Sequence, residues 1–250
     1  MGSDSWIKTY DDTDDFHNLL FCENDADEWY SHLTNSNGLN YDHVWQFEDS
    51  YENPQYRATE ANVTNRLNYI VDNANAGDII AFIFSGHGDN GTTSPVYSLC
   101  MWDANVGQGG YDGYLNHTEL ADIFDGCEAE RIFLFFDCCY SYGMRTAIDD
   151  LDNYDAFFLA AAADEDELAY EDYANDRGCW TYCFLEYGWF VDNSYSTITS
   201  FDDIFSDGYT KYRVTANDPY RPDDYNPNTY PKKYNGYGAD FCLSKYGITP

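Results

Sequence analysis

Three short apolar segments strongly limit the folds that this chain can adopt. Residues 79–84, 131–136 and 156–161 are apolar at almost every position, not at alternate positions. Strands that are buried on both faces have this composition, and they occur mainly in parallel sheets covered by helices. The sequence therefore predicts an α/β fold with a doubly wound, mostly parallel sheet flanked by helices.

Helical patterns lie between these segments. Residues 59–75 begin with a Thr–Glu pair and carry Val63, Leu67 and Ile70 on one face, as an amphipathic helix does. Further helices are expected at residues 25–33, 118–124 and 180–191. In a sheet of this kind, the ligand site lies beyond the carboxyl ends of the strands.

The length and the chain ends suggest one main domain. We expect a domain over residues 1–213, whose weakest element is a first strand at residues 5–10. Residues 214–250 are rich in Tyr, Asn and Pro, and this composition predicts an irregular extension that packs on the domain or on a neighbouring molecule. The start of the chain does not resemble a signal peptide.

Charge and cysteine content narrow the class of protein. The formal net charge is −33, so the surface should repel nucleic acid and anionic membranes and attract cations or basic substrates. No apolar run is long enough to span a membrane. The eight cysteines include no CxxC pair, which argues against a structural zinc site. Together with sequons at Asn62, Asn90 and Asn116, they favour an extracellular or surface location over the cytoplasm.

Reactive side chains follow two of the predicted strands. His87 follows the first strand between two glycines, and Cys139 follows the second. Because parallel strands end at one edge of a sheet, we expect these side chains to be neighbours. An imidazole can then accept the thiol proton, which is what a nucleophilic cysteine needs. The backbone N–H groups of Gly88 and Cys139 would stabilise the oxyanion that forms at an attacked carbonyl.

The same residues resemble the motifs of a known family. Residues 84–88 (FSGHG) resemble the histidine motif of metacaspases, and residues 137–141 (DCCYS) resemble their Asp-x-Cys-His-Ser motif. Residues 22–26 (CENDA) resemble the Cys-x-Asn-Asp-Ala segment of the family. The resemblance covers most of residues 16–190 and implies a caspase-like cysteine endopeptidase. Two departures follow the nucleophile, because Tyr140 replaces the family's histidine and Gly143 comes one place late.

The resemblance also implies a substrate preference. Metacaspases cleave after Arg or Lys, and the matching acids here are Asp25 and Asp137, with Cys22 and Ser85 as pocket walls. A buried carboxylate pair is costly unless a cation neutralises it, which gives this preference a physical reason. The alternative for Asp25 is that it only caps the helix that it precedes.

Calcium is the one cofactor that the resemblance suggests. Asp103 and residues 111–114 resemble the region where metacaspases supply calcium ligands. The candidate ligands are Asp103, Asp112, Asp149 and Asp150. Arg145 and Arg177 flank the Asp-rich segment after the nucleophile, and they are the expected self-processing sites.

Two other functions remain open at this stage. A legumain-like peptidase would share the His and Cys arrangement but would cleave after Asn. A non-enzymatic structural protein would keep the peptidase fold for assembly into filaments or a coat. The altered Cys loop and the Tyr-rich tail favour this second alternative, in which self-association is expected.

Overall fold

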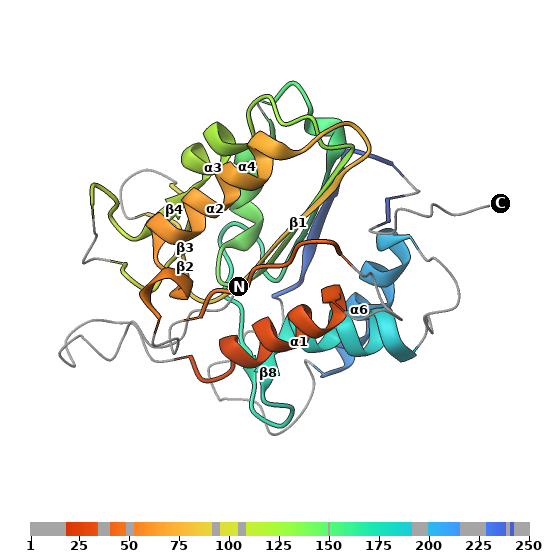
Figure 1. Ribbon diagram of the computed structural model, residues 1–250. Helices are drawn as coiled ribbons and strands as arrows, with labels where there is room; N and C mark the ends of the chain where they lie inside the picture. Colours follow the sequence, from red (N-terminus) through yellow and green to blue (C-terminus); the bar gives the residue numbers. More distant parts are fainter. Residues whose placement is uncertain are drawn as a thin grey trace.

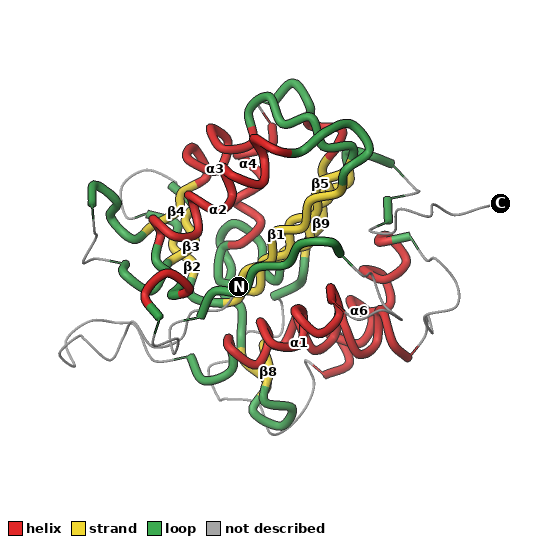
Figure 2. The backbone as a smooth tube through the Cα atoms, viewed as in Figure 1, coloured by secondary structure: helices red, strands yellow, loops and turns green. Residues whose placement is uncertain are grey.

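The three apolar segments form the centre of one sheet in the computed structural model. Strands β1 (Ile79–Ser85), β5 (Arg131–Asp137) and β6 (Phe157–Ala161) are parallel neighbours, and β9 (Lys232–Asn235) pairs antiparallel with β6, so the order is β1-β5-β6-β9 (Figure 2). The predicted mostly parallel sheet is therefore confirmed. Strand β9 lies within the extension that was expected to be irregular, where it covers the β6 edge that would otherwise be open to pairing.

The structure describes residues 19–34, 41–48, 53–91, 96–104, 109–149, 151–191, 200–215, 229–238 and 241–242. The first strand expected at residues 5–10 lies outside these ranges. The helices are α1 (Cys22–Thr34), α2 (Glu60–Asn73), α3 (His117–Phe124), α4 (Thr146–Asp149), α5 (Cys179–Tyr182), α6 (Phe201–Thr215), the π-helix η5 (Cys183–Val191) and the 3₁₀ turns η2 (Pro54–Tyr56), η3 (Ser141–Arg145) and η4 (Tyr154–Ala156). The short strands are β2 (Gly88–Asp89), β3 (Ser98–Cys100), β4 (Tyr114–Asn116), β7 (Glu171–Asp172) and β8 (Arg177–Gly178).

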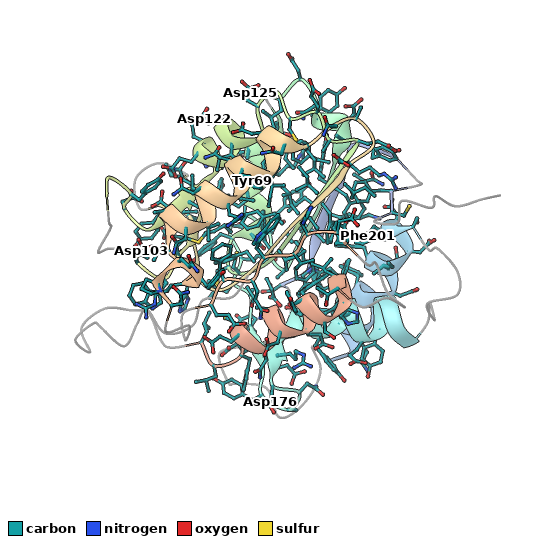
Figure 3. The ribbon with its side chains drawn as sticks, in the orientation of Figure 1. Tyr69, Asp103, Asp122, Asp125, Asp176 and Phe201 are labelled. Carbon is teal, nitrogen blue, oxygen red and sulfur yellow. The ribbon has the colours of Figure 1, made fainter. Side chains whose placement is uncertain are left out.

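Helices cover both faces of the central sheet. Figure 1 shows α2, α3 and α4 on one side of the sheet and α1 with α6 on the other. The period-two alternation of β5 explains this arrangement, because Leu134 packs in the core of the first side and Phe133 in the core of the second. Phe133 lies 4.5 Å from Phe201 of α6 between ring centroids, in a T-shaped contact. Figure 3 labels Phe201 beside the sheet.

The predicted helices match the structure except at one element. Helix α2 begins after Thr59, whose side chain accepts a hydrogen bond from Asn62 N–H at 3.3 Å. The helix expected at residues 180–191 is instead a short α-helix, α5, continued by the π-helix η5. A Cβ at Gly188 would overlap the carbonyl oxygen of Ile204, so glycine is what lets this segment approach α6.

Two further properties follow from the described residues. All eight cysteines lie among them, and each is a free thiol. Within the same ranges, no helix combines the length and apolarity that crossing a lipid bilayer requires.

Candidate functional site

The register of the sheet brings His87 and Cys139 to the same edge. Ser85, the last residue of β1, pairs with Asp137, the last residue of β5, and the N–H of Gly86 donates to the carbonyl of Asp137 at 3.2 Å. His87 and Cys139 each lie two positions beyond this pair. They therefore leave neighbouring strand ends together, which is the arrangement that a dyad needs.

Gly88 extends this contact to the backbone of the cysteine. The N–H of Cys100 in β3 donates to the carbonyl of His87 at 3.0 Å, which leaves Gly88 at a non-hydrogen-bonded position of the β2–β3 ladder. A Cβ at residue 88 would overlap the carbonyl oxygen of Cys139 and lie 3.2 Å from Cys138 Sγ. Only glycine permits this approach of the histidine loop to the cysteine loop.

The thiol of Cys139 contacts the main chain of Ala169. Its Sγ accepts a hydrogen bond from Ala169 N–H at 3.4 Å and donates to the Ala169 carbonyl at 3.8 Å. Burial raises the pKa of the Cys139 thiol to about 11; the Ala169 N–H acts against the rise, and the Asp137 carboxylate adds to it. At neutral pH the sulfur is protonated, so attack on a carbonyl requires a base beside it.

The conformation of the loop after the nucleophile accommodates Tyr140, the first departure from the family motif. Tyr140 adopts the left-handed conformation with φ of 56°, and the 3₁₀ turn η3 follows directly. The N–H of Tyr140 donates to the carbonyl of Glu167 at 2.8 Å, and the N–H of Tyr142 donates to the carbonyl of Ala163 at 3.0 Å. The segment that follows β6 thereby fixes the backbone on the far side of Cys139.

Asp25 is a buried carboxyl at the same edge of the sheet. It lies in the first turn of α1, 1% exposed, and accepts a hydrogen bond from Ser85 Oγ at 2.6 Å. The N–H of Gly178 in β8 donates to both of its oxygens, at 3.0 and 3.1 Å. Burial raises the pKa of Asp25 well above its usual value, and the charge of Asp137 raises it further, while the two donors lower it.

Asp137 is the second buried carboxyl. Its Oδ2 accepts hydrogen bonds from the N–H and the hydroxyl of Thr181 at 2.8 and 3.0 Å. Burial raises its pKa to about 6 against the effect of these donors. A Cβ at Gly178 would lie 2.7 Å from Asp25 Oδ2 and would overlap Asp137 Oδ2, so both carboxyls face one glycine.

The structure thus brings together Asp25, Asp137 and Ser85, three of the four residues that the sequence suggested for the pocket. Cys22 is buried one helical turn before Asp25 on α1, and Ser85 bridges α1 to β1. Sequence reasoning missed the residues of the β7–β8 hairpin and of α5 that hold the acids. The only signal for them was Gly178, a glycine placed directly before a helix start.

Three of the four aspartates suggested as calcium ligands lie within the described residues. Burial raises the pKa of Asp103 and the charge of Asp112 raises it further, so these two lie near each other. Asp103 lies near the start of α2 (Figure 3), where its Oδ1 accepts from Glu60 N–H at 2.9 Å. The Oδ1 of Asp112 accepts a hydrogen bond from the N–H of Tyr114 at 2.9 Å. The Oδ1 of Asp149, in α4, forms an ion pair with Nε of Arg145 at 3.1 Å. Asp150 lies outside the described residues. Within the described ranges, no three His, Cys, Asp or Glu side chains form a group that could hold a metal. The three described aspartates alone therefore do not form a calcium site, and the site that includes Asp150 stays a prediction.

The amino-acid sequence is similar to those of known metacaspases. The chain is 25% identical over 138 residues to Metacaspase-1 of Botryotinia fuckeliana, an alignment that covers 52% of this chain and 32% of that protein. It is 24% identical over 130 residues to Metacaspase-1A of Aspergillus fumigatus, covering 49% of this chain and 31% of that protein. The chain therefore matches about a third of the length of these relatives.

The fold and the family are supported separately. The crystal structure of protein GSU0716 from Geobacter sulfurreducens superposes with a TM-score of 0.57 at 16% identity, over 87% of this chain and 84% of that one. This likeness shows the fold alone. The family model described as metacaspase, peptidase C14 domain, matches residues 9–152, a span that includes His87 and Cys139. That span is more than half of the chain, and the protein therefore belongs to the metacaspase family.

Proposed function

We propose that this chain is a cysteine endopeptidase that cleaves after Arg or Lys. The observation that carries the proposal is the β1–β5 register, which brings two strand ends level and sets His87 and Cys139 beside a buried carboxyl pair. A nucleophile, a base and a cation-binding pocket at one edge of a sheet are the parts that such a reaction needs.

The reaction follows from the positions of these groups. His87 removes the thiol proton as Cys139 Sγ attacks the carbonyl carbon of the substrate, and a tetrahedral oxyanion forms. The N–H groups of Gly88 and Cys139 stabilise that oxyanion. Its collapse breaks the C–N bond, and the imidazolium returns the proton to the leaving amine. Water, activated by the same imidazole, then hydrolyses the thioester and restores the thiol.

The preference for a basic residue rests on the two carboxyls. Burial raises the pKa of both Asp25 and Asp137, and the charge of Asp137 raises the pKa of Asp25 further. A guanidinium or ammonium group that enters between them neutralises this charge and gains charge-assisted hydrogen bonds. An uncharged Asn side chain offers no such gain, which favours Arg or Lys over the legumain-like alternative.

A peptide panel with one matched change tests the proposal. Fluorogenic peptides that differ only in Arg, Lys, Asn or norleucine before the scissile bond are incubated with the wild type, Cys139→Ala and His87→Ala. We expect cleavage of the Arg and Lys peptides alone, and none by either variant. Cleavage of the Asn peptide would support the legumain-like alternative. Absence of cleavage, with no labelling of Cys139 by an Arg-directed thiol reagent, would support the structural protein, and polymers in electron micrographs would identify it.

Self-processing and calcium dependence belong to the same proposal. Arg145 is held by Asp149 and by the hydroxyl of Tyr142 at 3.2 Å, and Arg177 forms an ion pair with Glu28. Both guanidinium groups would have to leave these partners before entering a pocket. The intact mass of active enzyme is measured after incubation with calcium or with a chelator. We expect fragments that end at Arg145 and Arg177 with calcium, and the uncut chain with chelator. An unchanged mass in both conditions contradicts self-processing.

A further inference from the structure

Glu171 joins the pocket hairpin to the start of helix α1. Its Oε1 accepts hydrogen bonds from two consecutive N–H groups, Leu20 at 2.7 Å and Phe21 at 2.8 Å. The carbonyl of Phe21 in turn accepts from the N–H of Asp25 at 3.0 Å. A carboxylate at this position also suits the positive end of the helix dipole. The first turn of α1 is therefore anchored from outside by a residue about 150 positions away in the sequence.

The backbone of Glu171 closes a ring of contacts around the acid pair. Glu171 in β7 is the pairing partner of Gly178 in β8, and Gly178 donates its N–H to Asp25. One residue thus fixes the helix that carries Asp25 through its side chain, and the strand that binds Asp25 through its main chain. Phe21 also packs edge-on against Tyr173 at 5.3 Å, which holds the same junction from its apolar side.

We propose that Glu171 is a positioning residue that sets the affinity of the pocket for a guanidinium or ammonium group. The inference rests on the proposed function, because it concerns the same pocket. Glu171 acts by holding Asp25 at the distance from Asp137 that one cation can bridge. Its role requires an acceptor that reaches both N–H groups, and the negative charge alone is insufficient.

Three variants separate geometry from charge. Glu171→Ala removes the acceptor, Glu171→Gln keeps an acceptor oxygen without the charge, and Glu171→Asp keeps the charge on a side chain one methylene shorter. Glu128→Ala is the charge-matched control, because this exposed residue precedes β5 at the opposite end of the sheet from Cys139. Binding of agmatine, a small guanidinium probe, is measured by calorimetry in full-length protein that carries Cys139→Ala. The KM and kcat for Arg peptides are measured in parallel with Cys139 intact.

The expected result is a split between binding and chemistry. Glu171→Ala and Glu171→Asp should weaken agmatine binding and raise KM by at least about tenfold, with kcat and the iodoacetamide labelling rate of Cys139 within about twofold of wild type. Glu171→Gln and the control should bind as the wild type does. If Glu171→Ala unfolds, the agmatine affinities of the Glu171→Asp and Glu171→Gln variants decide between geometry and charge.

Other outcomes overturn the inference or separate it from the proposed function. Equal losses in the Gln and Ala variants would show that charge acts, not positioning, and wild-type binding by the Ala and Asp variants would remove the role altogether. Agmatine binding that depends on Glu171, without peptide cleavage by the wild type, would keep this inference and reject the peptidase. A wild type that does not bind agmatine rejects the inference.

Discussion

Replacing Thr181 with valine tests how the pocket controls the charge of Asp137. The Thr181 hydroxyl is fully buried and donates to Asp137 Oδ2 at 3.0 Å, while the Thr181 N–H donates to the same oxygen at 2.8 Å. Thr181→Val removes the first hydrogen bond, keeps the second and nearly preserves the shape. A hydrogen bond to a charged group contributes about 1.5–3 kcal/mol, and one pKa unit corresponds to about 1.4 kcal/mol. The pKa of Asp137, about 6 in the wild type, should therefore rise by about 1–2 units.

The expected loss of binding depends on pH in a way that identifies its cause. Near pH 7, the ionised fraction of Asp137 falls from about nine-tenths to between about one-half and one-tenth, so agmatine should bind roughly two- to tenfold more weakly. Near pH 9 the carboxyl is ionised in both proteins, and the difference should vanish. Calorimetric titration in the Cys139→Ala background measures agmatine binding at both pH values. Thr181→Ser is the control that keeps the hydroxyl. A loss of the same size at both pH values would refute the electrostatic reasoning, and so would unchanged binding at pH 7.

Two further predictions concern the contact of Gly88 with Cys139 and the buried acid Glu60 at the start of α2. Gly88→Ala places a Cβ against the carbonyl of Cys139, so we expect loss of peptide cleavage and a lower Tm by calorimetry, whereas wild-type kinetics would contradict the close approach. Burial raises the pKa of Glu60 to about 7, although the N–H of Gly113 donates to its carboxylate. An acid with a raised pKa stabilises the fold at low pH and loses this contribution as pH rises through about 7. Denaturant unfolding should therefore show Glu60→Gln gaining stability relative to wild type between about pH 4.5 and about pH 7, and a constant difference would contradict it.

The sequence predicted the sheet, and the sheet edge shared by His87 and Cys139, because both depend on local patterns. Uninterrupted apolar segments mark strands buried on both faces, and parallel strands share one carboxyl edge, so His87 and Cys139 could be placed together from position alone. Asp25 and Asp137 could be paired only through the family resemblance. No periodicity relates a helix start to the end of a distant strand.

The supports of the pocket were beyond sequence reasoning for a physical reason. Strands β7 and β8 have two residues each, too short to produce an alternating pattern, and Glu171 reads simply as one acid in an acidic stretch. The contacts of Gly178 and Thr181 with the two carboxyls span 153 and 44 positions, and they depend on tertiary packing. The calcium ligands were suggested by the family resemblance and by acidic residues in loops, and in a chain with 45 acidic residues loop acids alone do not select a ligand set.

The order in which the pocket residues occur along the chain has a consequence for synthesis. A chain leaves the ribosome from its N-terminus, so β1 and β5 can pair, and bring His87 and Cys139 to one edge, before Gly178 and Thr181 have been translated. Until then Asp25 lacks its main-chain donor and Asp137 lacks both of the donors from Thr181. The proposed cation pocket is therefore completed after the strand ends that carry His87 and Cys139, and a product truncated within the β7–β8 hairpin would contain both of these residues without Thr181.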